Sequence, residues 1–146
     1  MSDLKTLKNQ SRRQHKKSGK LPPFVPILWD ILNSVAYQEI PPSAAKALPH
    51  FLGKVKMNTR DPQYYNTPFP FSYSEGNRYG FAKATFARCI CDLMRYGFID
   101  PVEKGGLRGD SKTSSQFKLS ARWQRYGKAD FVEVRWETFV PKRITM

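Results

Sequence analysis

The chain has 146 residues and a hydrophobic fraction of 40%, which suits one domain with a core of its own. Its 25 Lys and Arg against 12 Asp and Glu give a net charge of +13, which favours a polyanionic partner over a neutral one. It contains no apolar run of about 18 residues and no apolar signal segment at its polar start, so we expect no membrane span, no membrane partner and a cytoplasmic location.

Residues 1–20 are predicted to form a disordered basic arm. They contain seven Lys and Arg against one Asp, with almost no apolar residue to fold around. Such an arm can follow phosphates or enter the minor groove of DNA. Its candidate contacts are Arg12, Arg13, Lys16 and Lys17. The plainer interpretation is a tail that only increases solubility.

Residues 21–128 are predicted to form the folded domain, which the chain enters through a stiff Pro-Pro segment. A first helix is expected at 27–33, with Trp29 in or near the core. A second helix is expected to begin at Pro42, because the fixed φ angle and missing N–H of proline suit a first turn. Pro49 lies inside this second pattern and predicts a kink or two short helices.

A loop, a short strand and another helix are expected next. Residues 58–68 have no helical period and contain two prolines, which is typical of a loop. Residues 69–72 suit an edge strand, which tolerates proline. The helix that follows covers 73–79, with Ser72 or Ser74 as its N-cap.

A second helix of this motif, residues 82–96, is predicted to have two unlike faces. Its apolar face, which we expect to pack inward, carries Phe86, Cys89, Ile90, Leu93 and Met94. Its small and cationic face carries Lys83, Ala84, Ala87, Arg88, Cys91 and Arg95. Gly97 follows as an expected C-cap.

A β-hairpin with a cationic tip is predicted after this helix. Its strands cover 98–103 and 115–120, the second of which alternates polar and apolar residues. The Gly-rich tip, 104–114, presents Lys104, Arg108 and Lys112. A nucleotide-binding phosphate loop would end in Gly-Lys-Ser/Thr and lead into a helix, so we expect no small-molecule ligand here.

The end of the chain, residues 129–146, is predicted to pack on the domain or at a dimer interface. A short helix is expected just before it, at 120–127, and a last strand within it, at 131–136. Trp123 and Trp136 are interpreted as core or interface residues rather than as residues that stack on a ligand.

The corner between the two motif helices carries a resemblance to a known family. Gly80 can take a positive φ, Gly76 is small where the helices cross, and Phe81 fills the core. The spacing resembles the helix-turn-helix of prokaryotic regulators at Gly76, Gly80, Phe81, Thr85, Phe86, Arg88 and Ile90. That family usually has Ala in place of Gly76 and a Ser N-cap in place of Ala82. Over residues 24–127 the element order is similar to winged-helix proteins of phages, plasmids and other mobile elements.

The resemblance implies an α+β, mainly α, winged helix-turn-helix fold that binds double-stranded DNA. The helix at 82–96 would enter the major groove, and the wing at 104–114 and the arm would contact the backbone or the minor groove. The candidate contacts are Lys83, Ala84, Ala87, Arg88 and Arg95 on the helix, with Lys104, Arg108 and Lys112 on the wing.

No catalytic or metal-binding pattern accompanies these residues. His15 and His50 belong to no recognisable constellation, and Cys89 and Cys91 point to different faces of one helix. We therefore expect no enzyme activity, no metal and no cofactor, with Cys89 filling the core.

Several roles fit these observations. The first is a sequence-specific transcriptional regulator associated with the nucleoid, expected to be a homodimer that reads two half-sites. The second is a replication or partition protein of a mobile element. An RNA-binding basic protein and a protein–protein adaptor built on the same fold remain as alternatives.

Overall fold

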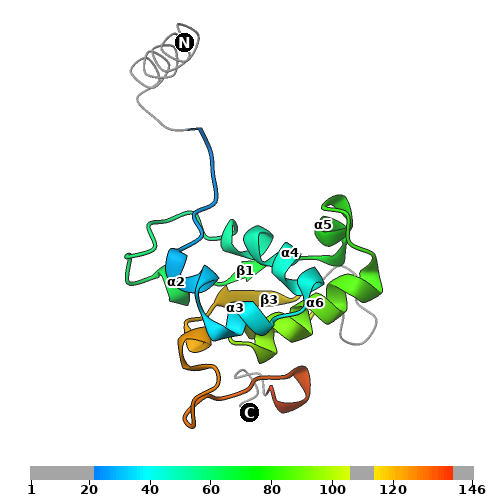
Figure 1. Cartoon of the computed structure of the whole chain (residues 1–146). Coiled ribbons are helices and arrows are strands. Elements are labelled where there is room, and N and C mark those ends of the chain that lie inside the picture. Colours follow the sequence, from blue (N-terminus) through cyan, green and yellow to red (C-terminus); the bar gives the residue numbers. More distant parts are fainter. Residues whose placement is uncertain (1–21, 106–113, 140–146) are drawn as a thin grey trace, which may run out of the picture.

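The computed structural model describes residues 22–105 and 114–139, which form an α+β fold. Within these residues, five α-helices and three 3-10 turns accompany a three-stranded antiparallel sheet (Figure 1). Their order is α2 (Trp29–Leu32), α3 (Val35–Glu39), α4 (Pro42–Leu52), η1 (Tyr64–Asn66), β1 (Phe69–Pro70), α5 (Tyr73–Arg78), α6 (Lys83–Arg95), β2 (Ile99–Glu103), β3 (Gln116–Leu119), η3 (Arg122–Arg125) and η4 (Trp136–Thr138).

The sheet has the order β1-β3-β2, so the hairpin strand β3 lies in the middle. β1 pairs with β3 through Phe69 and Phe117. Because β1 is an edge strand, it tolerates Pro70, which has no N–H to donate. β2 pairs with β3 from Ile99 opposite Leu119, with an irregularity after Pro101. The expected edge strand and hairpin strands are thereby confirmed, each slightly shorter than expected.

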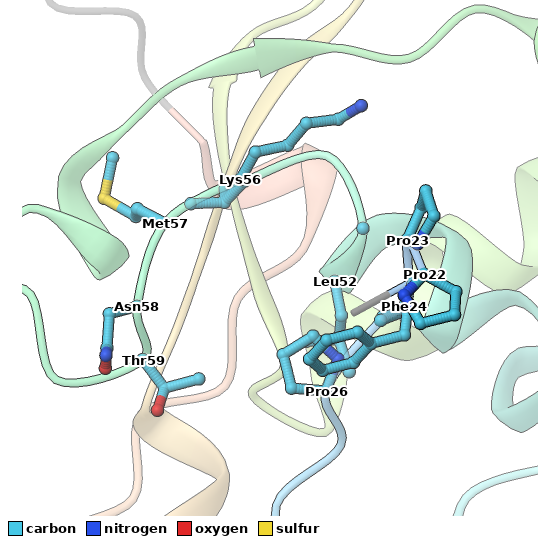
Figure 2. Close-up of a pocket in the computed structure, with 12 residues that line it drawn as sticks. Pro22, Pro23, Phe24, Pro26, Leu52, Lys56, Met57, Asn58 and Thr59 are labelled. Atoms are coloured by element: carbon cyan, nitrogen blue, oxygen red, sulfur yellow. The ribbon is translucent and has the colours of Figure 1, made fainter. Parts of the chain in front are cut away.

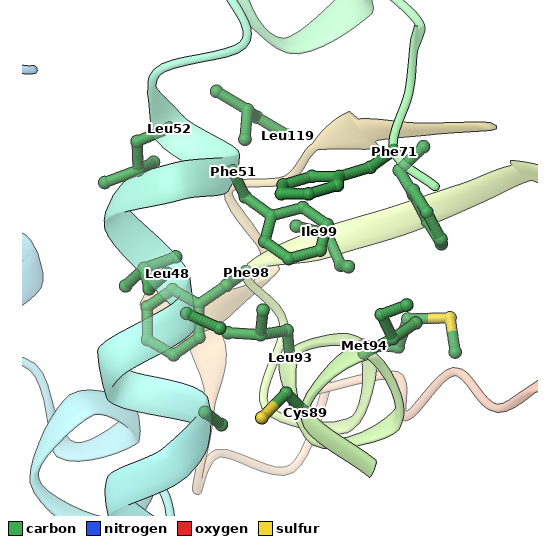
Figure 3. Packing of buried hydrophobic residues seen from close by; sticks show 14 of the residues in the cluster. Leu48, Phe51, Leu52, Phe71, Cys89, Leu93, Met94, Phe98, Ile99 and Leu119 are labelled. Atoms are coloured by element: carbon green, nitrogen blue, oxygen red, sulfur yellow. The ribbon is translucent and has the colours of Figure 1, made fainter. Parts of the chain in front are cut away.

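Phe51 of α4 lies at the centre of the core and packs against α6 and the sheet. Its ring centroid is 4.5 Å from that of Phe71, 5.9 Å from Phe86 of α6 and 5.8 Å from Phe117 of β3. Figure 3 shows Phe51 of α4 pointing into the space bounded by α6 and the strands. Each buried Phe contributes about 1.5–3 kcal/mol, so the cluster holds α4, α6 and the sheet together.

The apolar face of α6 is the one that the helical period predicts. Its five predicted inner residues are all buried: Phe86, Cys89, Ile90, Leu93 and Met94. The helix ends at Gly97, whose φ of +91° only glycine adopts readily. The N–H of Phe98 donates to the Leu93 carbonyl at 2.9 Å and that of Gly97 to Met94 at 3.2 Å, which is a Schellman cap.

Two expectations about the N-terminal helices are wrong. Trp29 is not a core residue: it is 76% exposed, because the single turn of α2 can bury only one side, and Ile31 occupies it. Of the two alternatives expected at Pro49, the division into two short helices is wrong, since α4 runs without a break from Pro42 to Leu52. The missing N–H of Pro49 costs a helical hydrogen bond, which the burial of Leu48, Phe51 and Leu52 offsets.

The expected strand at 131–136 is also wrong. This segment has no regular structure until the 3-10 turn η4, and the neighbouring 120–127 segment forms the 3-10 turn η3 rather than a longer helix. A strand needs a partner edge, whereas here the Val132 carbonyl accepts a hydrogen bond from Nη1 of Arg122 at 2.7 Å. Gly127, which follows η3, has a φ of +85°.

Arg122 connects the C-terminal segment to the rest of the fold. Its Nε donates to Oδ1 of Asp100 at 2.7 Å, and its Nη2 donates to the carbonyls of Met94 and Ile99 at 2.9 and 3.0 Å. One guanidinium therefore links the end of α6, β2 and the segment at 131–135. The segment continues to Trp136, whose ring lies 5.9 Å from that of Phe117.

Candidate nucleic-acid interface

The turn between α5 and α6 is built by two glycines that meet different requirements. Gly80 has a φ of +96° and open space where a Cβ would stand, so it is needed for its backbone conformation. Gly76 is needed for space, because a Cβ there would lie 2.7 Å from the ring of Phe86. Both roles agree with the sequence analysis, and Phe81 and Phe86 are buried as expected.

A capping box starts α5. The hydroxyl of Ser72 accepts from the N–H of Glu75 at 3.0 Å, and the Glu75 carboxylate accepts from the N–H of Ser72 at 3.3 Å. Glu75 also forms an ion pair with Lys54, which follows α4. Burial raises the pKa of Glu75, but the hydrogen bonds from Lys54 and Ser72 and the nearby positive charges outweigh it, so this pKa lies below its usual value.

The outer face of the first half of α6, from Lys83 to Arg88, is open and cationic. Lys83, Ala84 and Arg88 are exposed, and Ala87 is half-buried. Within residues 22–105 and 114–139, neither Lys83 nor Arg88 forms an ion pair. Nζ of Lys83 lies 5.6 Å from the centre of the exposed Tyr73 ring on α5. A polyanion can therefore approach this half without displacing a carboxylate.

The outer face of the second half of α6, from Cys91 to Arg95, has a different environment. Nη1 of Arg95 lies 3.4 Å from Oδ1 of Asp92, a buried acid that the sequence analysis did not consider. The Arg95 side chain is only 43% exposed, and its Nε is buried with no hydrogen-bond partner in the described part of the chain. Arg95 is therefore poorly placed to reach a base or a phosphate.

The C-terminal segment lies beside this second half. Burial raises the pKa of the Cys91 thiol, and the negative charges of Glu137 and Asp92 raise it further, against the positive charges of Lys104 and Arg95. Nζ of Lys104 is 5.3 Å from the centre of the Trp136 ring. The predicted wing contact Lys104 is exposed, but its neighbourhood also contains Trp136 and the acidic Glu137.

The remaining predicted contacts lie outside the described residues. These are Arg108 and Lys112 on the wing tip and Arg12, Arg13, Lys16 and Lys17 on the arm. The hairpin that would carry the wing tip is present up to Gly105 and again from Ser114. The N–H of Gly105 donates to the hydroxyl of Ser115 at 3.0 Å, which holds the two strands together where the tip begins.

The sequence analysis missed a group of residues from α4 and α5 that border the turn. His50 stacks on the exposed ring of Tyr79 with centroids 4.1 Å apart, and Nζ of Lys46 lies 5.2 Å from the centre of Phe81. Arg78 is exposed at the end of α5. Lys46 and His50 are four residues apart on one helix, which the helical period could have indicated, but only the fold brings Tyr79 to them.

The basic surface comprises four cationic side chains around the turn and the first half of α6: Lys46, Arg78, Lys83 and Arg88. Burial lowers the pKa of His50, and the charge of Lys46 lowers it further, which favours the neutral imidazole in the stack with Tyr79. The side chains of the basic surface thus combine positive charge with exposed aromatic rings, Tyr73 and Tyr79.

Within residues 22–105 and 114–139, no cluster of His, Cys, Asp and Glu could hold a metal ion. In the same residues, no helix has the length and apolar character needed to cross a bilayer. Comparison with known proteins finds no matching family model, no similar curated protein and no similar solved structure.

Proposed function

We propose that this chain binds double-stranded DNA as a winged helix-turn-helix protein, with α6 as the recognition helix and the β2–β3 hairpin as the wing. The observation that carries the proposal is the first half of α6. There, exposed Lys83 and Arg88 flank the small residues Ala84 and Ala87, and a helix whose other face is buried presents them outward.

The dimensions and chemistry of the major groove fit this half of the helix. A groove about 12 Å wide admits an α-helix, and small side chains allow the backbone to approach the base edges. The guanidinium of Arg88 can donate two hydrogen bonds to guanine, and the Ala84 methyl can contact a thymine methyl. Lys83 lies at the start of the helix, where it reaches a phosphate or a base.

The surrounding cations supply contacts that do not depend on sequence. Lys46, whose Nζ lies near the Phe81 ring, and Arg78, at the end of α5, would contact phosphates on the strands that border the groove. The basic arm at residues 1–20 adds seven Lys and Arg, so a steep salt dependence is expected. With few long side chains on α6, shape and phosphate contacts contribute much of the affinity.

The role that we favour is a sequence-specific regulator. The test is a selection of bound sequences from a random duplex pool, with single-stranded DNA and RNA as competitors at about 0.15 M salt. An enriched duplex motif supports the proposal. A preference for the RNA competitor, or the absence of any enriched duplex, overturns it.

A residue-level test uses Arg88→Ala with Arg60→Ala as the matched control. Both variants remove one exposed arginine, but Arg60 lies in the loop between α4 and β1, away from the turn. Arg88→Ala is expected to relax the selected motif at one position and to cost about 1–3 kcal/mol against the preferred base. Arg60→Ala is expected to leave the motif unchanged. If Arg88→Ala selects the same motif as Arg60→Ala, another element of the protein recognises the base sequence.

A further inference from the structure

Exposed apolar side chains concentrate at one place in the fold, which we call the N-terminal patch. Five of the eight large hydrophobic residues that are exposed in the described chain belong to it: Phe24 at 67%, Val25 at 40%, Ile27 at 37%, Trp29 at 76% and Val35 at 50%. Monomeric proteins scatter such residues singly over their surface, whereas here five fall within residues 24–35, which points to this segment as an interaction site.

The backbone holds the N-terminal patch in a fixed arrangement. Pro22, Pro23 and Pro26 restrict the lead-in segment to extended conformations, which lowers the entropy lost when a partner binds it. The single turn of α2 uses Ile31 for the core and turns Trp29 to solvent. Folding gains little from Trp29, so its indole remains available for another contact.

A concave apolar pocket of about 770 Å³ adjoins the patch. Its lining comes from the lead-in residues 22–26 and from the segment 52–59 that ends α4 and follows it. Figure 2 shows Phe24 and Pro26 beside Leu52, with Met57, Asn58 and Thr59 across the space. The lining is mostly apolar, with Lys56 as its only charged residue, which disfavours a cation and favours an apolar side chain with an acidic neighbour as the occupant.

We propose that a second copy of this chain occupies the pocket, so that the protein forms a two-fold dimer in which Trp29 of each protomer enters the pocket of the other. The exposed ring and the recess belong to neighbouring residues of the chain, and an isologous interface needs such a projection and recess close together on each protomer. Trp29 follows Pro26 of the pocket wall by three residues, so their Cα atoms lie within about 10 Å of each other.

Charge at the edges of the patch supports the same partner. Asp30 is exposed next to Trp29, and Lys56 is exposed at the pocket. When Trp29 enters the opposite pocket, Asp30 approaches Lys56 of the partner subunit, and the two-fold axis repeats this pair. A partner that lacks this arrangement would leave both charges without a complement.

The available apolar area suits a dimer of ordinary size. A stable interface buries about 800 Å² per partner, of which about 65% is apolar in homodimers. An aromatic side chain offers about 150–250 Å², so the exposed parts of Phe24 and Trp29 supply roughly 300 Å². Val25, Ile27, Val35 and the pocket lining supply the rest. α2 and the lead-in lie on the opposite side of the fold from the start of α6 (Figure 1), so the dimer leaves the basic surface open.

The test measures oligomeric state without DNA, so its outcome is independent of the proposed function. Sedimentation of the full chain from about 1 to 100 μM is expected to show the mass of two chains at the upper end. Trp29→Glu is expected to raise the dimer dissociation constant by about 30-fold or more, as a central interface residue does. Val132→Glu, at a residue 63% exposed outside the patch, is the matched control and is expected to leave the constant unchanged.

A charge exchange distinguishes this interface from any other. Asp30→Lys and Lys56→Asp are each expected to weaken the dimer, whereas the double variant restores it to within about threefold, because the pair is only reversed. A far-ultraviolet circular dichroism spectrum that matches the parent's identifies the folded variants, because loss of a dimer alone lowers the melting temperature. A monomeric parent over the whole concentration range, or a dimer that Trp29→Glu leaves intact, overturns the proposal.

Discussion

The two halves of α6 have the same helical period but different surroundings. From Lys83 to Arg88 the outer face is exposed, and no described acid pairs with its cations. From Cys91 to Arg95 the outer face lies beside Asp92 and Glu137 and is only partly exposed. One amphipathic pattern therefore produces a cationic surface in one half and a largely neutralised surface in the other. The position of an arginine on the polar face of a helix is not enough to assign it a ligand.

The largest expected effect is a loss of stability when the buried face of α6, which both halves share, loses an aromatic ring. Phe86 is completely buried and its ring contacts those of Phe51, Phe71 and Phe81. Phe86→Ala is expected to lower the free energy of unfolding by about 3–5 kcal/mol, through lost burial and a cavity. Urea denaturation monitored by circular dichroism measures it. A loss below about 1 kcal/mol would mean that α6 is not anchored by this face.

A somewhat smaller effect is expected where the second half of α6 ends. Gly97→Ala places a Cβ 2.6 Å from the backbone nitrogen of Trp123 at a positive φ, so strain and overpacking add to about 2–4 kcal/mol. Gly127→Ala is the matched control, since its φ is also positive but no atom lies within 4 Å of the added Cβ. It is expected to lose only about 1 kcal/mol. Equal losses for the two variants would place the cost in the backbone conformation alone.

Loosening the C-terminal segment should expose the outer face of the second half of α6 and leave the exposure of the first half unchanged. Arg122→Lys cannot reproduce the four hydrogen bonds of the guanidinium, and we expect a loss of about 1–3 kcal/mol in stability. With the segment less firmly held, Cys91 should react faster with a thiol reagent under native conditions. Arg125→Lys, whose partner Asp130 is exposed, is the control and is expected to change neither quantity. An unchanged Cys91 rate in Arg122→Lys would show that Arg122 does not hold the segment over α6.

The smallest expected effect is a pH dependence at the start of the motif. The pKa of Glu75 lies below its usual value, so its carboxylate stabilises the fold above about pH 4.5, and this contribution is lost as the pH falls through the folded-state pKa. Glu75→Gln should cost less than about 1 kcal/mol at pH 7. The difference between parent and variant should shrink as the pH falls towards 3. A difference that stays constant over this range would mean that the charge of Glu75 does not stabilise the fold.

Features set by neighbours in the chain could be predicted from the sequence. The buried face of α6, the cap at Gly97 and the corner at Gly80 each depend on residues within one or two turns. The hairpin strands could also be predicted, because alternation in β3 and its proximity to β2 specify a local pairing.

Features set by distant segments could not be predicted in this way. The exposure of Trp29 depends on which side of one short turn meets the core. The lack of a strand at 131–136 depends on the absence of a partner edge, and Pro49 is tolerated because α4 is packed on both sides of it. Asp92 is a different case: its (i, i+3) spacing to Arg95 could have indicated the ion pair from the sequence, but this pair was not predicted.

We expect the first half of α6 to contact DNA and the second half to make no such contact. The direct measurement is the affinity of the parent, Arg88→Ala and Arg95→Ala for one selected duplex at one salt concentration. We expect Arg88→Ala to weaken binding by about 5- to 150-fold, the equivalent of about 1–3 kcal/mol, and Arg95→Ala to stay within about threefold of the parent. A loss in Arg95→Ala equal to or greater than that in Arg88→Ala would contradict the account.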